Sequence, residues 1–382
     1  MKIKDICTFV TDGSHNPPQG IEKSEYMMLS SKNIFDDEIT FDEPRFLSQK
    51  DFEREHKRTK IVVGDVLLTI VGTVGRTAVV DEDMPTFALQ RSVAVLHPKN
   101  DVCLPRFLMY ALRGKRTYIE NRAKGVAQKG IYLKEVSDID IYIPDISNQE
   151  IIINKLDKVN AVIKFRQEEL LALDNLIKAR FVELFGHQSH NEKSLPYMTI
   201  DDVAEIYLGI THTPIYVDSG VMFISAKNTS GDFLDLSDVK YISREEFEGA
   251  PKGSKPQVND VLFSRVGSNL GHPVILEEEL ELCTFVSLGF LRSKGIVTSN
   301  YLKHWMRDEF FAKQVSEHVK GGGQPNLNTG WLKEFKIIVP GLEGQKEFDD
   351  FCKQVDKSKV AVKKALDETQ MLFDSLMQKY FA

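Results

Sequence analysis

The second half of this chain repeats the first, and no other feature restricts its fold as strongly. SHNP at 14–17 corresponds to THTP at 211–214, and VGDVLLTIVGT at 63–73 corresponds to VNDVLFSRVGS at 258–268. Further matches keep the same order and a nearly constant offset over half of the chain, which chance similarity does not do. We therefore expect two equivalent units in tandem.

Each repeat begins with a part of mixed secondary structure, about 1–140 in the first and 195–335 in the second. Short β-rich runs such as DVLLTIV and SVAVLHP alternate there with turn signals. Helical stretches are expected near 105–123 and 299–318. The pattern predicts two mixed α/β domains and an α+β fold for the whole chain.

Each mixed part is followed by one long helix. Glycine and proline are absent from Gln149 to Phe185 and from Gln345 to Ala382, a length well above that of an average globular helix. Apolar side chains recur at alternating spacings of four and three, the heptad pattern of a coiled coil. Two such helices of about 55 Å most simply pack on each other; the alternative is that each covers only its own domain. The predicted helix-packing residues are Ile152, Leu156, Val159, Ile163, Leu170, Leu173, Ile177, Leu184, Phe348, Val355, Val362, Leu366, Phe373, Leu376 and Tyr380.

Composition restricts where such a chain works. It has no run of about 18 apolar residues, so we expect no membrane span, and its start, MKIKDICTFVTDG, does not have the features of a secretory signal. The four cysteines are scattered, which argues against a disulfide framework and favours a reducing cytoplasm. The net charge of −7 does not exclude nucleic acid, because binding depends on a local patch.

One stretch is locally basic. From Arg106 to Lys134 the chain carries eight Lys or Arg residues and a single acid, Glu120. Such a run is either a solvated helix face or part of a surface for an acidic partner such as DNA.

Catalytic motifs are missing from the sequence. No phosphate-binding GxxxxGK[ST], GxSxG, HExxH or CxxC occurs. The glycine-rich KGGGQPNLNTG at 320–330 does not have the strand–loop–helix context that holds phosphate, so we interpret it as a mobile or DNA-facing loop. HNPPQ at 15–19 is similar to an amino-methyltransferase motif, but Gln19 replaces the aromatic residue that would stack on a base. The sequence therefore predicts neither an active site nor a metal site.

Polar side chains follow the duplicated strands, and they are of the kinds that contact base edges and phosphates. Each one alone is also a common loop residue. Because the strands are shared and the polar neighbours differ, we expect one scaffold with two different reading surfaces. The predicted DNA-contact residues are Ser14, His15, Lys32, Asn33, Thr69, Thr73, Arg76, Gln90, Arg91, Lys124, Gln128, Lys129, Thr211, His212, Lys227, Asn228, Ser264, Arg265, Ser268, Asn269, His272, Lys320, Gln324 and Asn326.

The duplicated GDVLL/NDVLF, LSSKN/ISAKN and IYIP…NQ/IIVP…GQ segments, together with the two long helices, resemble the specificity subunits of type I restriction–modification systems. The resemblance covers the whole chain. It implies a target recognition domain at 1–144, a first spacer helix at 145–187, a second target recognition domain at 188–340 and a second spacer helix at 341–382. It also implies that the two helices pack antiparallel and that the molecule is pseudo-two-fold symmetric.

The same resemblance implies a function without catalysis. Each recognition domain would read one half of a bipartite DNA target, and no cofactor would bind to this chain. Modification subunits, two in number, would bind S-adenosylmethionine and methylate adenine, and a restriction subunit would cleave the DNA. One departure is that FVSLGFLRS at 285–293 replaces LQRSVAVLHP, so Gln90 and Arg91 have no evident counterpart.

Two alternatives from other classes remain open at this point. The first is a coiled-coil scaffold whose duplicated domains bind protein or peptide, and the second is a stand-alone nuclease or methyltransferase. The missing motifs argue against the enzyme. The basic stretch and the polar loops favour DNA over a protein ligand.

Overall fold

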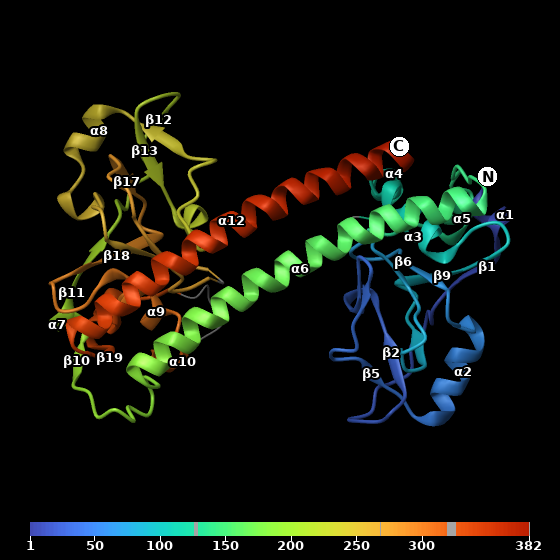
Figure 1. Cartoon of the computed structure of the whole chain (residues 1–382), viewed down its shortest axis with the longest axis horizontal. Helices are drawn as coiled ribbons and strands as arrows, with labels where there is room; N and C mark the ends of the chain where they lie inside the picture. Colours follow the sequence, from blue (N-terminus) through green and yellow to red (C-terminus); the bar gives the residue numbers. More distant parts are fainter. Residues whose placement is uncertain (126–128, 268, 319–325, 382) are drawn as a thin grey trace. The chain divides into compact units, whose positions relative to one another are not determined.

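The computed structural model describes residues 1–125, 129–267, 269–318 and 326–381. The chain divides into two compact units, and each long helix contributes to both (Figure 1). Unit 1 consists of Met1–Gln167 and Lys364–Ala382, and unit 2 consists of Glu168–Lys363. The compact units thus cut across the helices, whereas the domains predicted above treat each helix as a separate segment. Those boundaries stay a prediction.

Unit 1 contains a mixed set of short strands and helices followed by the first part of a 40-residue helix. Its elements are α1 (Ile3–Ile6), β1 (Cys7–Asp12), β2 (Met27–Leu29), the 3-10 helix η1 (Ser31–Asn33), β3 (Ile34–Phe35), β4 (Glu38–Ile39), β5 (Arg45–Phe46), α2 (Gln49–Thr59), β6 (Val66–Thr69), β7 (Thr77–Val79), β8 (Phe87–Leu89), β9 (Val93–Pro98), α3 (Pro105–Gly114), α4 (Arg116–Arg122), α5 (Leu133–Ser137) and α6 (Ile146–Phe185).

Unit 2 largely repeats this order, but it has no counterpart of the β3–β4 pair and adds β12, η3 and the strand pair β10–β19. Its elements are β10 (Tyr197–Thr199), α7 (Ile200–Val203), β11 (Ala204–Leu208), β12 (Tyr216–Val217), β13 (Val221–Ile224), the 3-10 helix η2 (Ala226–Thr229), β14 (Lys240–Ile242), α8 (Arg244–Gly249), the 3-10 helix η3 (Lys252–Ser254), β15 (Val261–Ser264), β16 (Pro273–Ile275), β17 (Leu282–Thr284), β18 (Leu288–Ser293), α9 (Ser299–Met306), α10 (Glu309–His318), α11 (Thr329–Glu334), β19 (Lys336–Ile338) and α12 (Leu342–Phe381).

The main sheets of the two units have the same topology, which confirms the predicted duplication. The strand order is β1-β9-β6-β7 in unit 1 and β11-β18-β15-β16 in unit 2, antiparallel throughout. The register also repeats, because Val66 pairs with Leu96 where Val261 pairs with Leu291. Each unit has a second sheet with one parallel pair, β2 with β8 and β13 with β17.

The aspartate of the duplicated DVL motif explains why these strands begin where they do. Asp65 accepts a hydrogen bond from the Val62 amide at 2.8 Å, and Asp260 accepts one from the Gln257 amide at 2.7 Å. Each carboxylate therefore closes a turn before a strand whose four residues are all buried. Burial raises the pKa of Asp65, although its hydrogen bonds with Val62 and His97 oppose the change.

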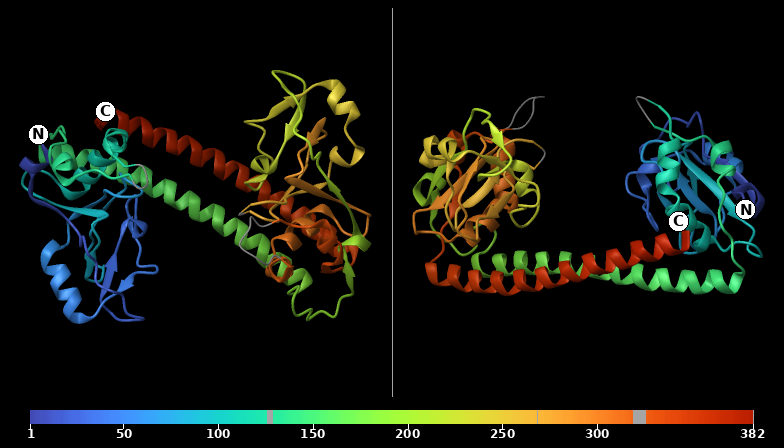
Figure 2. Two further views of the ribbon diagram at one scale, coloured as in Figure 1. Left: turned by 180° about the vertical axis from the view of Figure 1, so that it is seen from behind. Right: turned by 90° about the horizontal axis from the view of Figure 1, so that it is seen from above.

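The long helices pack on each other within each unit, and both lie along one side of its mixed domain (Figure 2). In unit 1, Leu156 and Ile163 of α6 share a core with Phe373 and Phe381 of α12. The two helices run in opposite directions. Lys155 donates a hydrogen bond to Tyr380, whereas Arg166, later in α6, donates one to Thr369, which comes earlier in α12. The two helices are thus antiparallel, as the resemblance implied.

Unit 2 uses the other halves of the same helices. Ile177 and Phe181 of α6 share a core with Phe348 and Val355 of α12, and Arg180 forms an ion pair with Glu347. Of the predicted packing residues, Leu156, Ile163, Ile177, Phe348, Val355 and Phe373 are buried, and the other nine are half-buried. The heptad did not single out Phe181, Phe185 and Phe381, which are also buried.

No helix in the described part of the chain is long and apolar enough to span a membrane.

Candidate nucleic-acid interface

Five loops meet at one edge of unit 1, and Ser92 joins three of them. Its hydroxyl accepts a hydrogen bond from the Ser31 amide at 3.0 Å, and its carbonyl accepts one from the Ile70 amide at 2.8 Å. The Arg91 amide donates to the Ser14 carbonyl at 2.9 Å, and the Gly72 amide donates to the Lys129 carbonyl at 3.0 Å. We call this set loop edge 1; its described residues are 12–16, 29–33, 69–76, 89–92, 124–125 and 129–130.

Unit 2 builds the same edge around Ser287. Its hydroxyl accepts from the Ala226 amide at 3.2 Å, and its carbonyl accepts from the Arg265 amide at 2.9 Å. The Val286 amide donates to the Ile210 carbonyl at 2.9 Å, as Arg91 does to Ser14 in unit 1. Loop edge 2 comprises the described residues 209–213, 224–228, 264–267, 269–272, 284–288 and 326–328. The polar loops predicted to read DNA are therefore brought together in both units.

Some predicted contact residues face the protein interior instead. Asn33 is 1% exposed; its side chain accepts from the Ser30 amide at 3.1 Å and donates to the Asp42 carbonyl at 2.9 Å. Asn228 repeats this arrangement with Ser225 and Asp235. Such bonds hold the loop in shape and leave little capacity for a ligand. The predicted residues with buried side chains are Ser14, Asn33, Thr69, Asn228 and Ser264, and their geometry favours a structural role.

The remaining predicted residues lie at or near the surface. The exposed ones are His15, Lys32, Thr73, Arg91, Lys124, Lys129, Thr211, His212, Lys227, Asn269 and Asn326, and the half-buried ones are Arg76, Gln90, Arg265 and His272. Gln128, Ser268, Lys320 and Gln324 lie outside the described residues.

The histidines of the matching SHNP and THTP segments have carboxylate partners that the sequence did not reveal. His15 Nε2 lies 2.8 Å from Asp12 Oδ2, and His212 Nε2 lies 2.7 Å from Glu246 Oε1. Asp12 ends a strand, whereas Glu246 comes from α8, so the partners are not repeated. Both imidazoles are exposed by more than half.

Arg265 distinguishes loop edge 2 from loop edge 1, where Ile70 holds the corresponding position. Its guanidinium donates to the Leu327 carbonyl at 3.2 Å and to the Val286 carbonyl at 3.1 Å. Burial lowers the pKa of Arg265, and no carboxylate pairs with it within the described ranges. A positive charge without an acidic partner suits contact with a polyanion.

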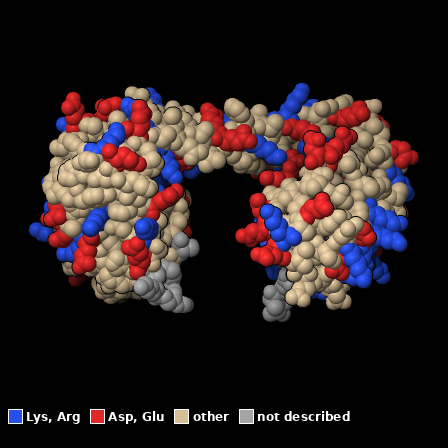
Figure 3. All heavy atoms as spheres, turned by 90° about the horizontal axis from the view of Figure 1, so that it is seen from below, with Lys and Arg blue, Asp and Glu red and all other residues tan. Residues whose placement is uncertain are grey.

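A basic helix beside loop edge 1 was missed from the sequence. Arg58 of α2 donates to Asp12 at 3.4 Å, which places this helix next to His15. Lys57 and Lys60 are exposed beside it, and Lys and Arg side chains gather on one side of the right-hand unit in Figure 3. The run EREHKRTK at 53–60 was the available signal.

The corresponding helix of unit 2 is acidic. Helix α8 begins at a serine cap equivalent to that of α2, since Ser48 and Ser243 each accept from the amide three residues on. Its exposed residues include Glu245 and Glu248. The two edges therefore share a backbone frame but differ in the charge beside it.

The basic run at 106–134 only partly forms a free surface. Arg106 bridges Asp37 and Asp157, and Arg116 pairs with Asp36. Arg113 lies over the ring of Phe373, 5.1 Å from its centroid. These three arginines hold unit 1 together, so only the rest of the run is free to face a ligand, and its role in DNA binding stays a prediction.

The chemistry available at both edges is hydrogen bonding and charge. Within the described ranges, no three His, Cys, Asp or Glu side chains form a group able to hold a metal. The cysteines are buried, and burial raises the pKa of Cys7, Cys103 and Cys352 to about 12.

Comparison with known proteins identifies relatives of the same architecture. Among curated proteins, the type I restriction enzyme EcoBI specificity subunit of Escherichia coli is 26% identical over 188 residues, which are 48% of this chain and 38% of the relative. The MjaVIII specificity subunit of Methanocaldococcus jannaschii is 20% identical over 285 residues, 70% of this chain and 67% of the relative. The chain thus spans about two fifths of the first relative's length.

A solved structure shows a similar fold over the full length. The type I restriction–modification S subunit from M. genitalium has a TM-score of 0.59 at 14% identity, covering 100% of this chain and 95% of that one. The family model of the type I restriction modification DNA specificity domain matches residues 1–174 and again residues 195–369. The two matches fall on the two repeats, and the chain belongs to the family of type I restriction–modification DNA specificity domains.

Proposed function

We propose that this chain is the sequence-specific DNA-binding subunit of a type I restriction–modification complex and that it reads a bipartite target. Loop edge 1 reads one half-site, and loop edge 2 reads the other. The observation that carries this proposal is the duplicated edge: Ser92 and Ser287 tie the same loops together, while the side chains presented there differ. Arg91 corresponds to Val286, and Ile70 corresponds to Arg265.

Different side chains on one frame are what two unrelated half-sites require. A base edge is distinguished by the donors, acceptors and apolar groups placed against it, whereas the frame only has to place them at the groove. Loop edge 1 offers Gln90 and Arg91 at the position where loop edge 2 offers Phe285 and Val286. The two units should therefore recognise different bases.

The chain itself performs no catalysis in this proposal and binds no cofactor. Modification subunits, two in number, would bind S-adenosylmethionine and methylate adenine, and a restriction subunit would cleave. Support for protein partners comes from the large apolar side chains exposed on the long helices, including Phe165 at 65% and Met371 at 63% in unit 1 and Leu171 at 62% in unit 2. Contiguous exposed apolar patches mark sites of protein association.

The long helices would set the separation of the two half-sites. Helices α6 and α12 each run for 40 residues without a break, and each contributes to both units. Adding four residues to each helix would lengthen it by about 6 Å. The expected result is a longer gap between unchanged half-sites in the methylated sequence. An unchanged gap would refute the spacer role alone.

Methylome sequencing tests the proposed function directly. A strain that carries the gene, together with the modification subunit genes, should show methyl-adenine in a two-part motif. Deletion of the gene should remove that motif and leave other methylation intact. If the motif persists, the protein does not direct methylation, and a scaffold that binds other proteins becomes the favoured account.

A further inference from the structure

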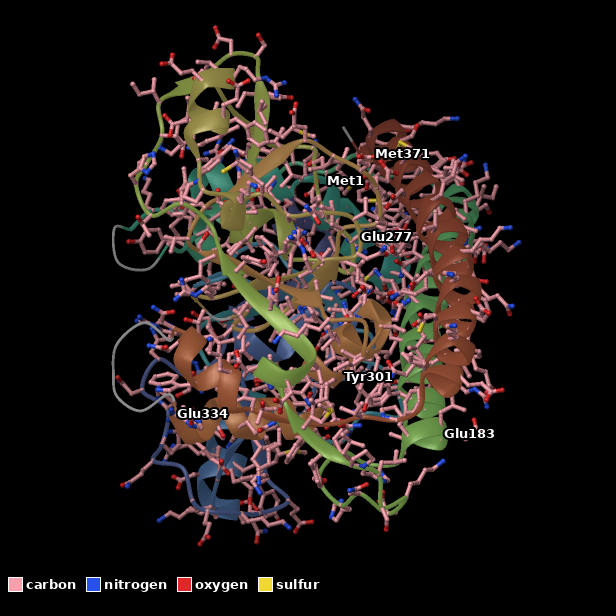
Figure 4. The ribbon with its side chains drawn as sticks, turned by 90° about the vertical axis from the view of Figure 1, so that its left-hand side faces the viewer. Met1, Glu183, Glu277, Tyr301, Glu334 and Met371 are labelled. Carbon is pink, nitrogen blue, oxygen red and sulfur yellow. The ribbon has the colours of Figure 1, made fainter. Side chains whose placement is uncertain are left out.

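A cavity of about 700 Å³ opens in unit 2 between the start of α9, the strands beside it and α12. Its lining includes Phe233, Glu277, Asn300, Asp349 and Asp356. Figure 4 labels Glu277 and Tyr301 on the side of the unit where α9 and α12 lie. All residues of this cavity belong to unit 2.

The repeat shows what fills the same place in unit 1. Gln149 of α6 accepts a hydrogen bond from the Leu104 amide before α3, and Gln345 of α12 accepts one from the Thr298 amide before α9, both at 2.8 Å. Helix α9 therefore corresponds to α3, and α12 corresponds to α6. On that register, Asn300 stands where unit 1 has Arg106. Further along α12, Lys353 replaces Asp157, and Asp356 replaces Asn160.

In unit 1 the Arg106 side chain occupies this position. Its Nε donates to the two oxygens of Asp157 at 3.1 and 3.0 Å, and its Nη1 donates to Asp37 Oδ1 at 3.0 Å. Tyr110 and Asn160 complete the network with bonds of 2.6 and 2.8 Å. A guanidinium held by two carboxylates is thus the occupant that this fold uses here.

Three carboxylates, those of Glu277, Asp349 and Asp356, line the unit 2 cavity at positions other than those of Asp37 and Asp157, and no arginine is among the lining residues. Asp349 accepts a hydrogen bond from Thr298 Oγ1 at 2.8 Å. Burial raises its pKa, although hydrogen bonding with Thr298 and Asn300 opposes the change. Asp356 and Glu277 form no ion pair in the part of the chain that the structure describes.

Among the described residues, no lysine forms an ion pair with these groups, although Lys303 interacts electrostatically with Asp356 and Glu277 and Lys353 with Asp349. Lys353 lies 3.7 Å from Asp350 and is 73% exposed, so its ammonium group is in water. Lys357 is exposed at the rim. Lys303 is buried below, 5.6 Å from the centre of the Phe233 ring.

We propose that the unit 2 cavity receives an arginine side chain from a partner protein that packs along α12, replacing in trans what Arg106 supplies in cis in unit 1. The planar guanidinium can donate to a carboxylate through two parallel hydrogen bonds, whereas an ammonium acts as a compact point charge. The volume is larger than one side chain, so neighbouring residues of the partner would enter with it. Val360, 56% exposed, offers them an apolar contact at the rim. This inference depends on the proposed function in one respect, because both require that the chain binds a protein partner.

The isolated full-length chain tests the cavity itself. N-acetyl-L-arginine methylamide is titrated by NMR, with N-acetyl-L-lysine methylamide as the control ligand. The wild type should bind the arginine compound saturably and at least fivefold more tightly than the lysine compound. The variant Asn300→Arg/Lys353→Asp, which recreates the unit 1 pairing, should weaken binding at least tenfold. The variant Glu277→Gln/Asp356→Asn removes two carboxylate charges without breaking a buried hydrogen bond, and it should also weaken binding of the arginine compound at least tenfold.

Wild-type binding that is absent, or that both variants retain, would overturn the inference. A second measurement uses the modification subunits with the full chain in sedimentation experiments. The variant Asn300→Arg/Lys353→Asp, which fills the cavity, should weaken assembly with the modification subunits at least tenfold. Asn300→Gln leaves the cavity open and should not weaken assembly. If the filled variant assembles as well as the wild type, the inference is also overturned. If no modification subunit binds the wild type, the proposed function fails instead, and the arginine titration still decides the cavity.

Discussion

Gln149 and Gln345, one repeat apart, make the same three hydrogen bonds in the two units. Gln149 accepts from the Leu104 amide and donates to the Val102 and Pro144 carbonyls, each at 2.8 Å. Gln345 accepts from the Thr298 amide at 2.8 Å and donates to the Ile296 and Pro340 carbonyls at 3.2 and 2.9 Å. Both side chains are fully buried, so each joins a long helix to the mixed domain of its unit.

Replacing Gln149 by leucine should destabilise unit 1 strongly. The substitution keeps the volume but leaves one amide and two carbonyls without partners, at a cost of roughly 2–4 kcal/mol in the free energy of unfolding. Chemical denaturation measures it, with the exposed neighbour Glu150→Ala as the control. Gln345→Leu should have a similar effect on unit 2. A loss below about 1 kcal/mol for both would show that these bonds do not hold the helices in place.

Lys303 is buried where unit 1 has Met109, which predicts that Lys303→Met stabilises unit 2. Burial lowers the pKa of this lysine, and the nearby Arg307 charge adds to the effect. The unfolded chain therefore binds more protons than the folded one between the lowered pKa and the ordinary value near 10.4. Wild-type stability should rise across that interval as the pH increases.

The stabilities of the wild type and of Lys303→Met should be compared at pH 7 and pH 9.5, because wild-type stability is expected to rise between these values. Lys303→Met should raise the free energy of unfolding by about 1 kcal/mol or more at pH 7, and the difference should shrink at pH 9.5. The exposed substitution Lys357→Met controls for removal of a charge without burial. A difference that grows with pH would contradict the assignment.

Asn33 and Lys32 are neighbours in sequence with opposite expected roles. Asn33→Ala removes a buried side chain that bonds the Ser30 amide and the Asp42 carbonyl, so it should cost roughly 1–3 kcal/mol of stability. Lys32→Ala, at an exposed position, should leave unfolding unchanged and weaken DNA binding. Thermal unfolding and fluorescence anisotropy separate the two effects. If Lys32→Ala destabilises as much as Asn33→Ala, the division between frame and surface is wrong.

The sequence predicted the architecture because repetition and helix periodicity are visible in residue order. The heptad located Leu156, Ile177 and Phe348, since apolar spacing directly encodes which helix face is buried. It could not distinguish Asn33, which holds its own loop, from Lys32, which faces solvent. That difference depends on where the backbone amides of the loop point, which side-chain types alone do not reveal.

The basic helix was missed for a related reason. Lys57 and Arg58 lie far from His15 in sequence, and the contact between Arg58 and Asp12 brings them beside it. Arg106 is the opposite case. In the sequence it counts as part of a basic run, but in the structure it forms ion pairs with Asp37 and Asp157. Pairing across long sequence distances decides whether a charge is free.

Removing the basic charge beside loop edge 1 should weaken DNA binding in a sequence-independent way. The double variant Lys57→Ala/Lys60→Ala removes up to two phosphate contacts, so the steepness of log affinity against log salt should fall by up to about 2. Binding to random and target duplexes should weaken together. The acidic helix of unit 2 gives a control, since Glu245→Ala/Glu248→Ala should not weaken binding. An unchanged salt dependence in the double variant would exclude this basic segment from the interface.

The measurement that tests the central claim most directly is methylome sequencing of strains with matched substitutions at one edge only. His15→Ala/Arg91→Ala changes loop edge 1, and His212→Ala/Asn326→Ala changes loop edge 2, all at exposed positions. The expected result is relaxed or altered base preference in one half of the motif for the first variant and in the other half for the second. Changes in both halves from either variant, or no change in base preference from both, would contradict the account of two independent reading edges.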